Sequence, residues 1–464
     1  MDSSRPVVVV LLLAAVAAGA MLRLWHLGAS ELSPDEAASW AAAAAPTVAG
    51  VLARSAVLNP GKLAAYDLVL HGWIQVFGDG TLTMRLLSTL LGVVAIMLVY
   101  WVARELLTLG VDFESGDLSI DYPAALSALL FAVTLAMIRY TREARMYPLM
   151  IAAQLAQTGF LLRAHRRGGL ASCAAVSLFT ALSFAANFTA VFLIAAQSLW
   201  LLLSKEGRRC GLPWRPLAAL AAGGIVFLPV LASAVQNSVH ALNEGALNWI
   251  SPPSWWGLFS FFNRAAGTLP FPVLLLLAVW GAISQWRVRS AAIVFALFWM
   301  WGPVLLLYLV SLAITPMLVE RYALSSLVPF MILAALGICE FVSSGARTAA
   351  VAIAVAVSIA HAAPFLRKPP SLQWTHAAQR IEASSPRAVI AVAPGYGANV
   401  LRYYFSGKRE YAALPLTLNA CAGSDFLFLW DHALSGPSGK DAHECSAAFK
   451  RTVFSEKDVN LLAR

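Results

Sequence analysis

Residues 7–22 read VVVVLLLAAVAAGAML and contain no charged side chain. With its flanks, such a run is typical of a membrane-spanning helix, which needs about 20 mostly apolar residues to cross the hydrocarbon core. Arg5 precedes the run, and Arg23-Leu24-Trp25-His26 follows it. Because these following residues do not form a small-residue cleavage site, we predict a first transmembrane helix rather than a signal peptide.

The composition of the whole chain extends this pattern. Of the 464 residues, 59% are hydrophobic and only 12% are charged, whereas soluble domains contain about 25% charged residues. These values exclude a soluble enzyme, a disordered chain and a coiled coil, and they predict a polytopic all-α membrane protein. The net charge of +9 includes no Lys/Arg block that would suit nucleic acid, so we expect it to set topology and to serve an anionic ligand.

Further hydrophobic runs recur until about residue 363 and predict about eleven transmembrane helices within residues 1–365. The predicted spans are Val7–Leu22, Leu86–Val102, Ala124–Ile138, Leu149–Leu162, Leu170–Ala186, Ala190–Leu203, Leu217–Ala234, Phe271–Ile283, Ala291–Ile314, Leu327–Val342 and Ala349–Ala363. A cytoplasmic N-terminus leaves more Lys and Arg on the cytoplasmic side, as the positive-inside rule requires. We therefore expect a multi-pass protein of the cytoplasmic (inner) membrane. An odd number of spans places the C-terminal tail outside the cytoplasm.

The tail, residues 366–464, mixes polar and apolar residues. Ala388–Val392 and Phe426–Trp430 resemble strands, and a helical pattern lies near Asn399–Phe405, so we predict a small non-cytoplasmic α/β domain. Cys421 and Cys445 lie in it, in a compartment where disulfides persist. A disulfide and two unpaired thiols both remain possible. The five cysteines form no CxxC pair, which argues against a zinc site.

The first outer loop, residues 24–84, is far longer than the other loops. Its aromatic residues and apolar spacing predict two interfacial amphipathic helices, at about Glu36–Ala53 and Lys62–Phe77. The loop begins with Ser33-Pro34-Asp35-Glu36. Ser33 or Asp35 can cap the helix that follows, with Pro34 in its first turn. The alternative is that adjacent carboxylates at the membrane surface act as a general base or bind a metal. We expect His71 to be structural.

A second loop has the sequence Arg139-Tyr140-Thr141-Arg142-Glu143-Ala144-Arg145-Met146-Tyr147-Pro148. The three arginines are spaced by three residues, which predicts one shared face if the segment is helical. Guanidinium groups offer a planar fork of donors that suits phosphate. The cluster therefore predicts an anion site. The alternative is a cluster that faces lipid headgroups.

The order of these motifs resembles the GT-C membrane glycosyltransferases, in particular bacterial members of the protein-mannosyltransferase and aminoarabinose-transferase superfamily. The resemblance extends over about residues 20–345 and more loosely over the tail. The motifs are Ser33-x-Asp35-Glu36, Asn59-Pro60, His71-Gly72-Trp73-x-x-x-Phe77-Gly78, Arg85-Leu86-x-Ser88, Tyr140-x-x-Glu143-x-Arg145-Met146-Tyr147, Trp249-Ile250-x-Pro252-Pro253 and Glu320-Arg321-Tyr322.

The resemblance implies a GT-C-like fold and an inverting transfer of a sugar from a polyprenyl-phosphate carrier to a lipid, glycan or protein acceptor. It places catalysis at Asp35, as general base, and at Glu36. Donor-phosphate binding falls on a set of basic and phenolic side chains, and Glu143 orients these cations or holds a metal. The donor-binding set is Arg142, Arg145, Tyr147, Arg321, Tyr322 and Lys62. A divalent metal is a possible cofactor, membrane lipids are expected contacts, and nucleic acid is not.

The chain departs from the family pattern at two places. Asn59-Pro60-Gly61-Lys62 stands where relatives often have His-Pro-Pro or Glu-Lys-Pro, which displaces Lys62. Asn187-Phe188 stands where many relatives have His-Tyr, which removes a candidate metal ligand and leaves metal dependence open. Three other classes of membrane protein are alternatives: a lipid-linked-sugar transporter, a polysaccharide ligase or polymerase, and a non-catalytic scaffold. We find no internal repeat typical of transporters, and ligases usually have their large loop late in the chain.

Overall fold

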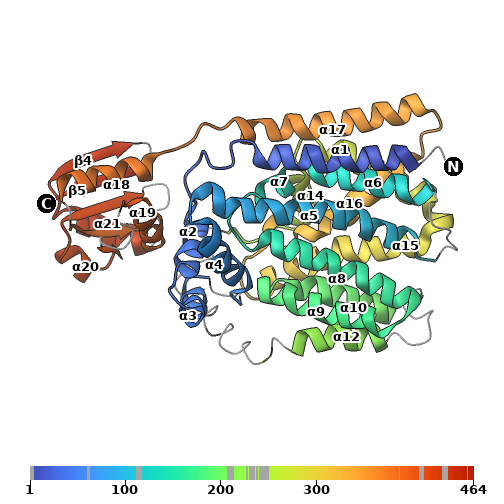
Figure 1. Cartoon of the computed structure of the whole chain (residues 1–464), viewed down its shortest axis with the longest axis horizontal. Coiled ribbons are helices and arrows are strands. Elements are labelled where there is room, and N and C mark those ends of the chain that lie inside the picture. Colours follow the sequence, from blue (N-terminus) through green and yellow to red (C-terminus); the bar gives the residue numbers. More distant parts are fainter. Residues whose placement is uncertain are drawn as a thin grey trace. The chain divides into compact units, whose positions relative to one another are not determined.

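The computed structural model describes residues 5–59, 63–110, 118–205, 214–225, 228, 236, 239, 250–385, 387–406, 412–430, 437–456 and 458–464 (Figure 1). The chain divides into two compact units. The helical unit comprises Met1–Leu27, Pro60–Val69 and Arg85–Lys368, and the α/β unit comprises Gly28–Asn59, Leu70–Met84 and Pro369–Arg464. Residues of the first outer loop therefore belong to the same compact unit as the C-terminal tail.

The helical unit is built from long apolar helices that run along a common direction in Figure 1. Its helices are α1 (Arg5–Leu24), most of α5 (Thr81–Leu107), α6 (Leu118–Val133), α7 (Leu135–Tyr140), α8 (Tyr147–Arg167), α9 (Leu170–Ala186), α10 (Ala190–Leu203), α12 (Trp214–Ile225), α14 (Gly257–Ala266), α15 (Phe271–Ala313), α16 (Leu327–Cys339) and α17 (Ser344–Arg367). Short 3-10 turns lie at Glu320–Tyr322 and Leu324–Ser326. Each of the eleven predicted spans overlaps one of these helices, although the end of Leu217–Ala234 lies outside the described residues.

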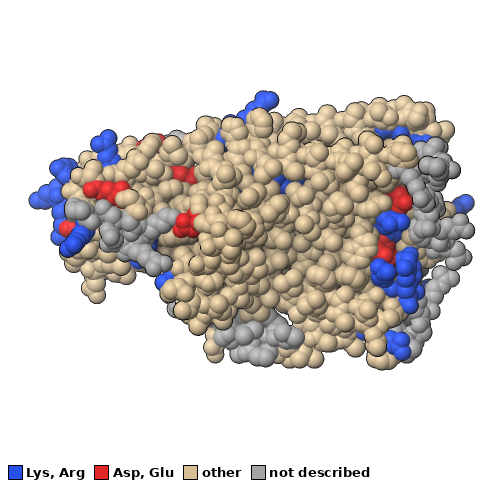
Figure 2. Space-filling model, viewed as in Figure 1, with Lys and Arg blue, Asp and Glu red and all other residues tan. Residues whose placement is uncertain are grey.

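Four of the described helices are long and apolar enough to cross a membrane: Pro6–Leu24 of α1, α5, α15 and α17. The apolar side chains of α1 face outward, for example Val10 and Leu13, each 64% exposed. Such exposure is costly in water and is expected for a helix that faces lipid. Figure 2 shows a broad, largely uncharged surface over these helices, with a group of acidic and basic side chains at the right-hand end of the view. The chain is a multi-pass membrane protein.

The charged end of the helical unit is held by ion pairs and by a buried arginine. Arg166 pairs with Glu105, and Arg104 pairs with Asp121. Arg289 is only 5% exposed and donates to the backbone carbonyl of Leu107 at 2.6 Å. The structure brings the arginines of these contacts to one end of the helices.

Two predicted spans, Phe271–Ile283 and Ala291–Ile314, both lie in α15. Within α15 two helices meet at Arg289, whose φ of −126° and ψ of 31° are not helical. The prediction of two separate helices, made because polar residues interrupt the apolar run, is confirmed. The first half of α15 packs very closely on α16. A methyl group on Gly337 would lie 1.9 Å from the carbonyl oxygen of Leu277, so this contact requires glycine, as close helix packing in membranes often does.

The α/β unit contains a five-stranded sheet with the order β2-β1-β3-β5-β4. The strands are β1 (Val389–Ala393), β2 (Ala412–Pro415), β3 (Phe426–Trp430), β4 (Arg451–Glu456) and β5 (Val459–Ala463). β1 pairs in parallel with β2 and β3, whereas β5 is antiparallel to β3 and β4. The predictions of β1, β3 and the intervening helix are confirmed, since α19 covers Ala398–Tyr404. The strands β2, β4 and β5 were not predicted.

Helices cover the sheet of the α/β unit and supply its core. They include α18 (Gln373–Ser384), α20 (Leu418–Ala422) and α21 (Pro437–Ser446). Trp374 of α18 stacks on Phe428 of β3, with ring centroids 4.7 Å apart. The core also contains Ala37 of α2, a helix of the first outer loop. A first-loop residue thus packs in the same core as the sheet.

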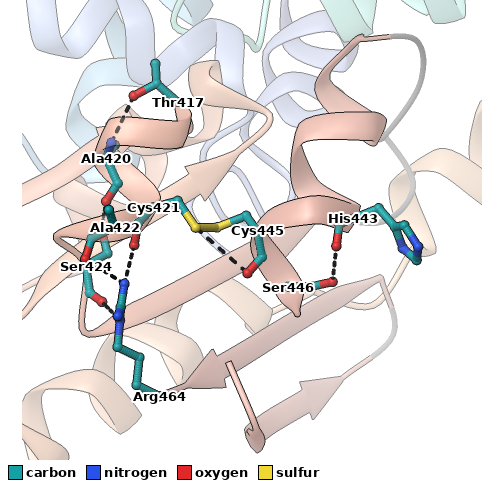
Figure 3. Close-up of a disulfide and its surroundings, with 9 residues drawn as sticks. All are labelled: Thr417, Ala420, Cys421, Ala422, Ser424, His443, Cys445, Ser446 and Arg464. Atoms are coloured by element: carbon teal, nitrogen blue, oxygen red, sulfur yellow. Dashed lines mark hydrogen bonds between the residues drawn. A yellow bond between two sulfur atoms is a disulfide. The ribbon is translucent and has the colours of Figure 1, made fainter. Parts of the chain in front are cut away.

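The structure joins Cys421 and Cys445 in a disulfide, with Cα atoms 5.9 Å apart. Of the two possibilities left open by the sequence, the disulfide is the correct one. Figure 3 shows it beside Arg464, whose guanidinium donates to the backbone carbonyls of Cys421, Ala422 and Ser424 at 2.6–2.7 Å. The C-terminal side chain and the disulfide therefore secure the same turn.

The first outer loop forms three helices: α2 (Pro34–Ala43), α3 (Val48–Leu58) and α4 (Ala65–Phe77). The prediction of one helix over Glu36–Ala53 is therefore wrong. Pro46 lacks an N–H and disfavours helical backbone in the residue before it, and the Thr47 side chain then caps α3 by accepting from the N–H of Gly50 at 3.1 Å. The helix predicted for Lys62–Phe77 is present as Ala65–Phe77, with Leu63 and Ala64 outside it.

Candidate active site

The acidic pair lies at the start of α2, where Ser33 is the N-cap. The Ser33 hydroxyl accepts from the N–H of Glu36 at 3.2 Å, and the Glu36 carboxylate accepts from the N–H of Ser33 at 2.9 Å. This is a capping box with Pro34 in the first turn, so the capping interpretation is confirmed for Ser33. Glu36 is 2% exposed, and its carboxylate stabilises the helix start.

Asp35 takes no part in the capping box, and its charge acts on Tyr396. The pKa of the Tyr396 phenol is raised above its usual range, first by burial and second by the negative charge of Asp35. Tyr396 precedes α19, and α19 packs on α2: the Trp40 and Tyr403 rings meet edge to face at 5.1 Å. Because Asp35 lies near Tyr396 and Trp40 near Tyr403, the two helices run in the same direction.

The segment from Thr141 to Met146 is a turn and not a helix, since α7 ends at Tyr140 and α8 begins at Tyr147. The expectation that three arginines share one helical face is therefore wrong. Pro148 explains the break, because a helix that continued through it would lose a hydrogen bond and clash with the preceding turn. Arg139 is exposed and pairs with Glu143 at 3.5 Å, whereas Arg145 is 2% exposed.

Arg142 belongs to a cationic cluster at the C-terminal end of α1, made of Arg23, Arg85 and Arg142. Arg142 donates to the carbonyl of Trp25, and Arg85 donates to that of Leu27 at 3.0 Å. Burial, and secondarily the charge of Arg85, lower the pKa of Arg142 to about 10. Cations are favourable at a helix C-terminus. A guanidinium has five donors, so one side chain can contact a carbonyl and an anion together.

Arg23 positions the turn that presents Arg142. It is fully buried, and its Nε donates to the hydroxyl of Thr141 at 2.8 Å. Its Nη1 donates to the carbonyls of Gly19 and Ala132 at 3.0 and 2.9 Å. One side chain thus joins α1, α6 and the start of the turn.

The predicted tyrosines and Arg321 lie near the same turn of the helical unit. Tyr147 is 1% exposed and packs edge to face on Tyr140 at 5.2 Å. Tyr140 in turn has electrostatic interactions with both Glu143 and Arg321. Arg321 lies over the ring of Tyr322 at 5.6 Å. The structure therefore groups these site residues within one unit, with Arg139 as the exposed outlier.

The predicted residues do not supply a metal site in the described parts of the chain. There, no three His, Cys, Asp or Glu side chains form a group that could hold an ion. The Glu36 carboxylate holds the capping box, and Glu143 pairs with Arg139. Lys62 lies outside the described residues, as does Trp249 of the later motif.

Three of the residues described above were not predicted from the sequence as site residues: two arginines of the helical unit and one tyrosine of the α/β unit. Arg85 occurs in one of the family motifs, and Arg23 is the charged residue that ends the first apolar run. A charged residue directly after an apolar run is a sequence feature that could have indicated Arg23 as a site residue. Tyr396 has no comparable feature, because its proximity to Asp35 depends on long-range packing of α19 on α2.

The fold is similar to that of several solved membrane glycosyltransferases. ArnT from Cupriavidus metallidurans, in a structure bound to undecaprenyl phosphate, matches with a TM-score of 0.62 at 12% identity, over 98% of this chain and 97% of ArnT. The oligosaccharyltransferase of Archaeoglobus fulgidus, in complex with Zn and sulfate, gives 0.56 at 13%, over 90% and 67%. The arabinofuranosyltransferase AftD from Mycobacteria gives 0.53 at 15%, over 97% and 39%. The molecule therefore has a GT-C membrane glycosyltransferase fold.

Residues 64–232 match the dolichyl-phosphate-mannose-protein mannosyltransferase family. A comparison with curated protein sequences gives no match. The resemblance inferred from the motifs is confirmed: the chain is similar to the mannosyltransferase family in sequence and to ArnT in fold.

Proposed function

We propose that the protein is an inverting glycosyltransferase that moves a sugar from a polyprenyl-phosphate carrier to a lipid, glycan or protein acceptor. The reaction takes place on the outer face of the cytoplasmic membrane, and the C-terminal domain lies on the same side. The observation that supports this most is the gathering of Arg23, Arg85 and Arg142 about the end of α1 and the following turn.

The donor half of the proposal rests on charge. The leaving group is a polyprenyl phosphate, and preorganised cations stabilise the charge that develops on it. Arg142 and Arg145 bind this phosphate together with Arg321, Lys62 and the phenols of Tyr147 and Tyr322. Glu143 orients these cations. The ArnT relative was solved with undecaprenyl phosphate, and the archaeal oligosaccharyltransferase with a dolichol-phosphate and an inhibitory peptide, which supports this class of donor.

The acceptor half rests on Asp35. Its carboxylate takes the proton of the acceptor hydroxyl while that oxygen attacks the anomeric carbon, on the face opposite the phosphate. The bond between the anomeric carbon and the phosphate oxygen breaks, and polyprenyl phosphate leaves with inversion. We assign Glu36 a positioning role, because its carboxylate holds the helix that presents Asp35.

The test compares Asp35→Asn with Asp458→Asn, a matched change at an exposed position of the same unit. Wild type, each variant and an empty control are compared by mass analysis of envelope lipids and glycans. We expect Asp35→Asn to lower sugar transfer by about 10²–10⁴-fold, the usual contribution of a general base, and Asp458→Asn to change nothing. Binding of undecaprenyl phosphate to the purified chain should persist in both variants. Near-normal transfer by Asp35→Asn would refute the assignment.

A further inference from the structure

The α/β unit contains a cavity of about 950 Å³ that the proposed reaction leaves without a role. Its walls come from α2, α3, α19 and β2, together with Asp79. Cavities that bind small ligands measure roughly 300–1,000 Å³ and combine apolar walls with a few polar groups. This cavity has that composition, since alanine, valine, leucine and proline line it beside Arg54, Asp79, Asn399 and Arg402.

Two guanidinium groups enter the cavity from different elements, Arg54 from α3 and Arg402 from α19. Arg54 donates to the carbonyl of Ala41 at 3.0 Å, and Arg402 donates to that of Ala413 at 2.6 Å. These contacts orient both side chains while most of their five donors remain for other partners. Burial, and secondarily the charge of Arg54, lower the pKa of Arg402. An anion between the two cations would relieve their mutual repulsion.

The other polar groups of the cavity suit hydroxyl groups. The Asp79 carboxylate accepts from the indole N–H of Trp40 at 2.9 Å, which holds it at the wall as an acceptor. Asn399 adds an amide with both donors and an acceptor. A ligand that fits this set has an anionic group for the arginines and hydroxyls for Asp79 and Asn399.

The cavity shares two elements with the acidic site. The helix α2 presents Asp35 in its first turn, and Trp40 and Ala41 of the same helix line the cavity. Five residues of α-helix separate Asp35 from Trp40, a rise of about 7.5 Å. The segment that leads into α19 has the same arrangement: Tyr396 lies near Asp35, and Asn399 lines the cavity. A chain-like ligand seated in the cavity can therefore extend along α2 toward Asp35.

We propose that this cavity binds an anionic saccharide, the part of the acceptor glycan that lies beyond the reacting hydroxyl. The inference rests on the proposed function for the identity of the ligand as acceptor, but the binding itself does not require turnover. Carboxylate and phosphate groups both fit a pair of arginines, so the test includes an arm for each.

The experiment uses the full chain in lipid nanodiscs and isothermal titration calorimetry at low salt. The probes are trigalacturonate, its neutral counterpart maltotriose, and inorganic phosphate. Trigalacturonate should bind the wild type, bind at least about tenfold more tightly than maltotriose or phosphate, and weaken as sodium chloride is added. Equal binding of maltotriose would overturn the anionic part of the proposal, and equal binding of phosphate would overturn the saccharide part.

The variants are Arg54→Gln and Arg402→Gln, with Arg380→Gln on α18 as an exposed control in the same unit. Each cavity variant should weaken trigalacturonate binding at least about tenfold, while the control stays within twofold. Arg54 lies on the exposed side of α3, so we expect Arg54→Gln to fold. If Arg402→Gln does not fold, Arg54→Gln still tests the inference. Wild-type affinity in both cavity variants would overturn the inference.

A failure of this inference differs from a failure of the proposed function. If Asp35→Asn retains full sugar transfer, the proposed reaction is wrong whatever the calorimetry shows. If Asp35→Asn abolishes transfer while trigalacturonate binding does not depend on Arg54 or Arg402, the reaction stands and the cavity has no role in recognising an anionic saccharide.

Discussion

The two units use charge at helix ends in opposite ways. In the helical unit, arginines gather where α1 ends, and Arg85 and Arg142 donate to the carbonyls of Leu27 and Trp25. In the α/β unit, carboxylates lie where helices begin. Glu36 accepts from the N–H of Ser33, and Glu31 accepts from the N–H groups of Trp374 and Thr375 at the start of α18. Both arrangements complement the helix dipole.

The difference determines which groups remain for chemistry. A guanidinium that donates one hydrogen bond to a carbonyl still has several donors for a phosphate. A carboxylate that completes a capping box is held at the helix start, where one of its oxygens accepts from the N-cap N–H. The helical unit can therefore use one set of arginines for both structure and ligand binding. In the proposed reaction, the α/β unit divides these tasks between Glu36, which holds the helix, and Asp35 beside it.

The largest expected effect tests the dual use of the arginines. Removing the side chain of Arg142 should weaken binding of undecaprenyl phosphate by 30-fold or more, because loss of one partner of a buried charge contact costs about 2–5 kcal/mol. Arg139→Ala is the matched control, since Arg139 is exposed and pairs with Glu143. Exposed pairs contribute well under about 1 kcal/mol, so its affinity should stay near wild type.

Affinity of the purified variants for the lipid, measured by native mass spectrometry in detergent, separates these outcomes. Arg142→Lys should recover only part of the loss, because a point charge does not reproduce the planar fork. If Arg142→Ala and Arg139→Ala bind the lipid equally well, the arginines at the end of α1 serve the helix alone.

The next effect concerns the capping box, which tests the division of tasks in the α/β unit. Ser33→Ala removes the acceptor for the N–H of Glu36 and should lower the local opening free energy of α2 by about 1 kcal/mol. Amide hydrogens of α2 should then exchange about fivefold faster by mass spectrometry. Thr417→Ala, which removes the equivalent cap of α20, is the control and should leave exchange in α2 unchanged. Unchanged exchange of α2 in Ser33→Ala would refute the structural role of the box.

Much of the helical unit could be predicted from the sequence because lipid imposes a strong pattern. A segment that crosses a bilayer must be apolar along its whole length, so the runs mark the helices. The pattern does not show where a helix breaks. Pro46 divides α2 from α3, and Pro148 prevents a helix that continues from α7 into α8. The break at Pro46 was not predicted, although the local rules for proline indicate both breaks. The break at Arg289 has no proline, and the guanidinium of this residue donates to the carbonyl of Leu107.

The α/β unit was harder to predict because its sheet depends on residues far apart in sequence. β1 and β3 are nearly continuous apolar runs, as expected for buried parallel strands. β4 has a largely exposed pattern and gives little hydrophobic evidence of a strand. The same limit applies to the site. Asp35 was proposed from its position after the first span, but Tyr396 and the cavity depend on the packing of α19 against α2, which no local pattern indicates.

The smallest expected effect concerns Glu31, whose carboxylate accepts from the backbone N–H groups at the start of α18. Burial raises the pKa of Glu31 above its ordinary value of 4.5, although hydrogen bonds from Thr375 and Trp374 oppose the shift. A raised pKa means that the folded state binds more protons than the unfolded state in the interval above 4.5. Stability should therefore fall as pH rises through this interval.

The Glu31→Gln variant keeps an acceptor for Thr375 but has no charge to bury. Relative to this variant, the wild type should lose up to about 1 kcal/mol as the pH rises from 4 to 7, because Glu31 is only half-buried and solvent screens its charge. Thermal unfolding of both proteins across this pH range measures the difference. A wild type that gains stability over Glu31→Gln as the pH rises would mean that the hydrogen bonds at the helix start outweigh the cost of burial.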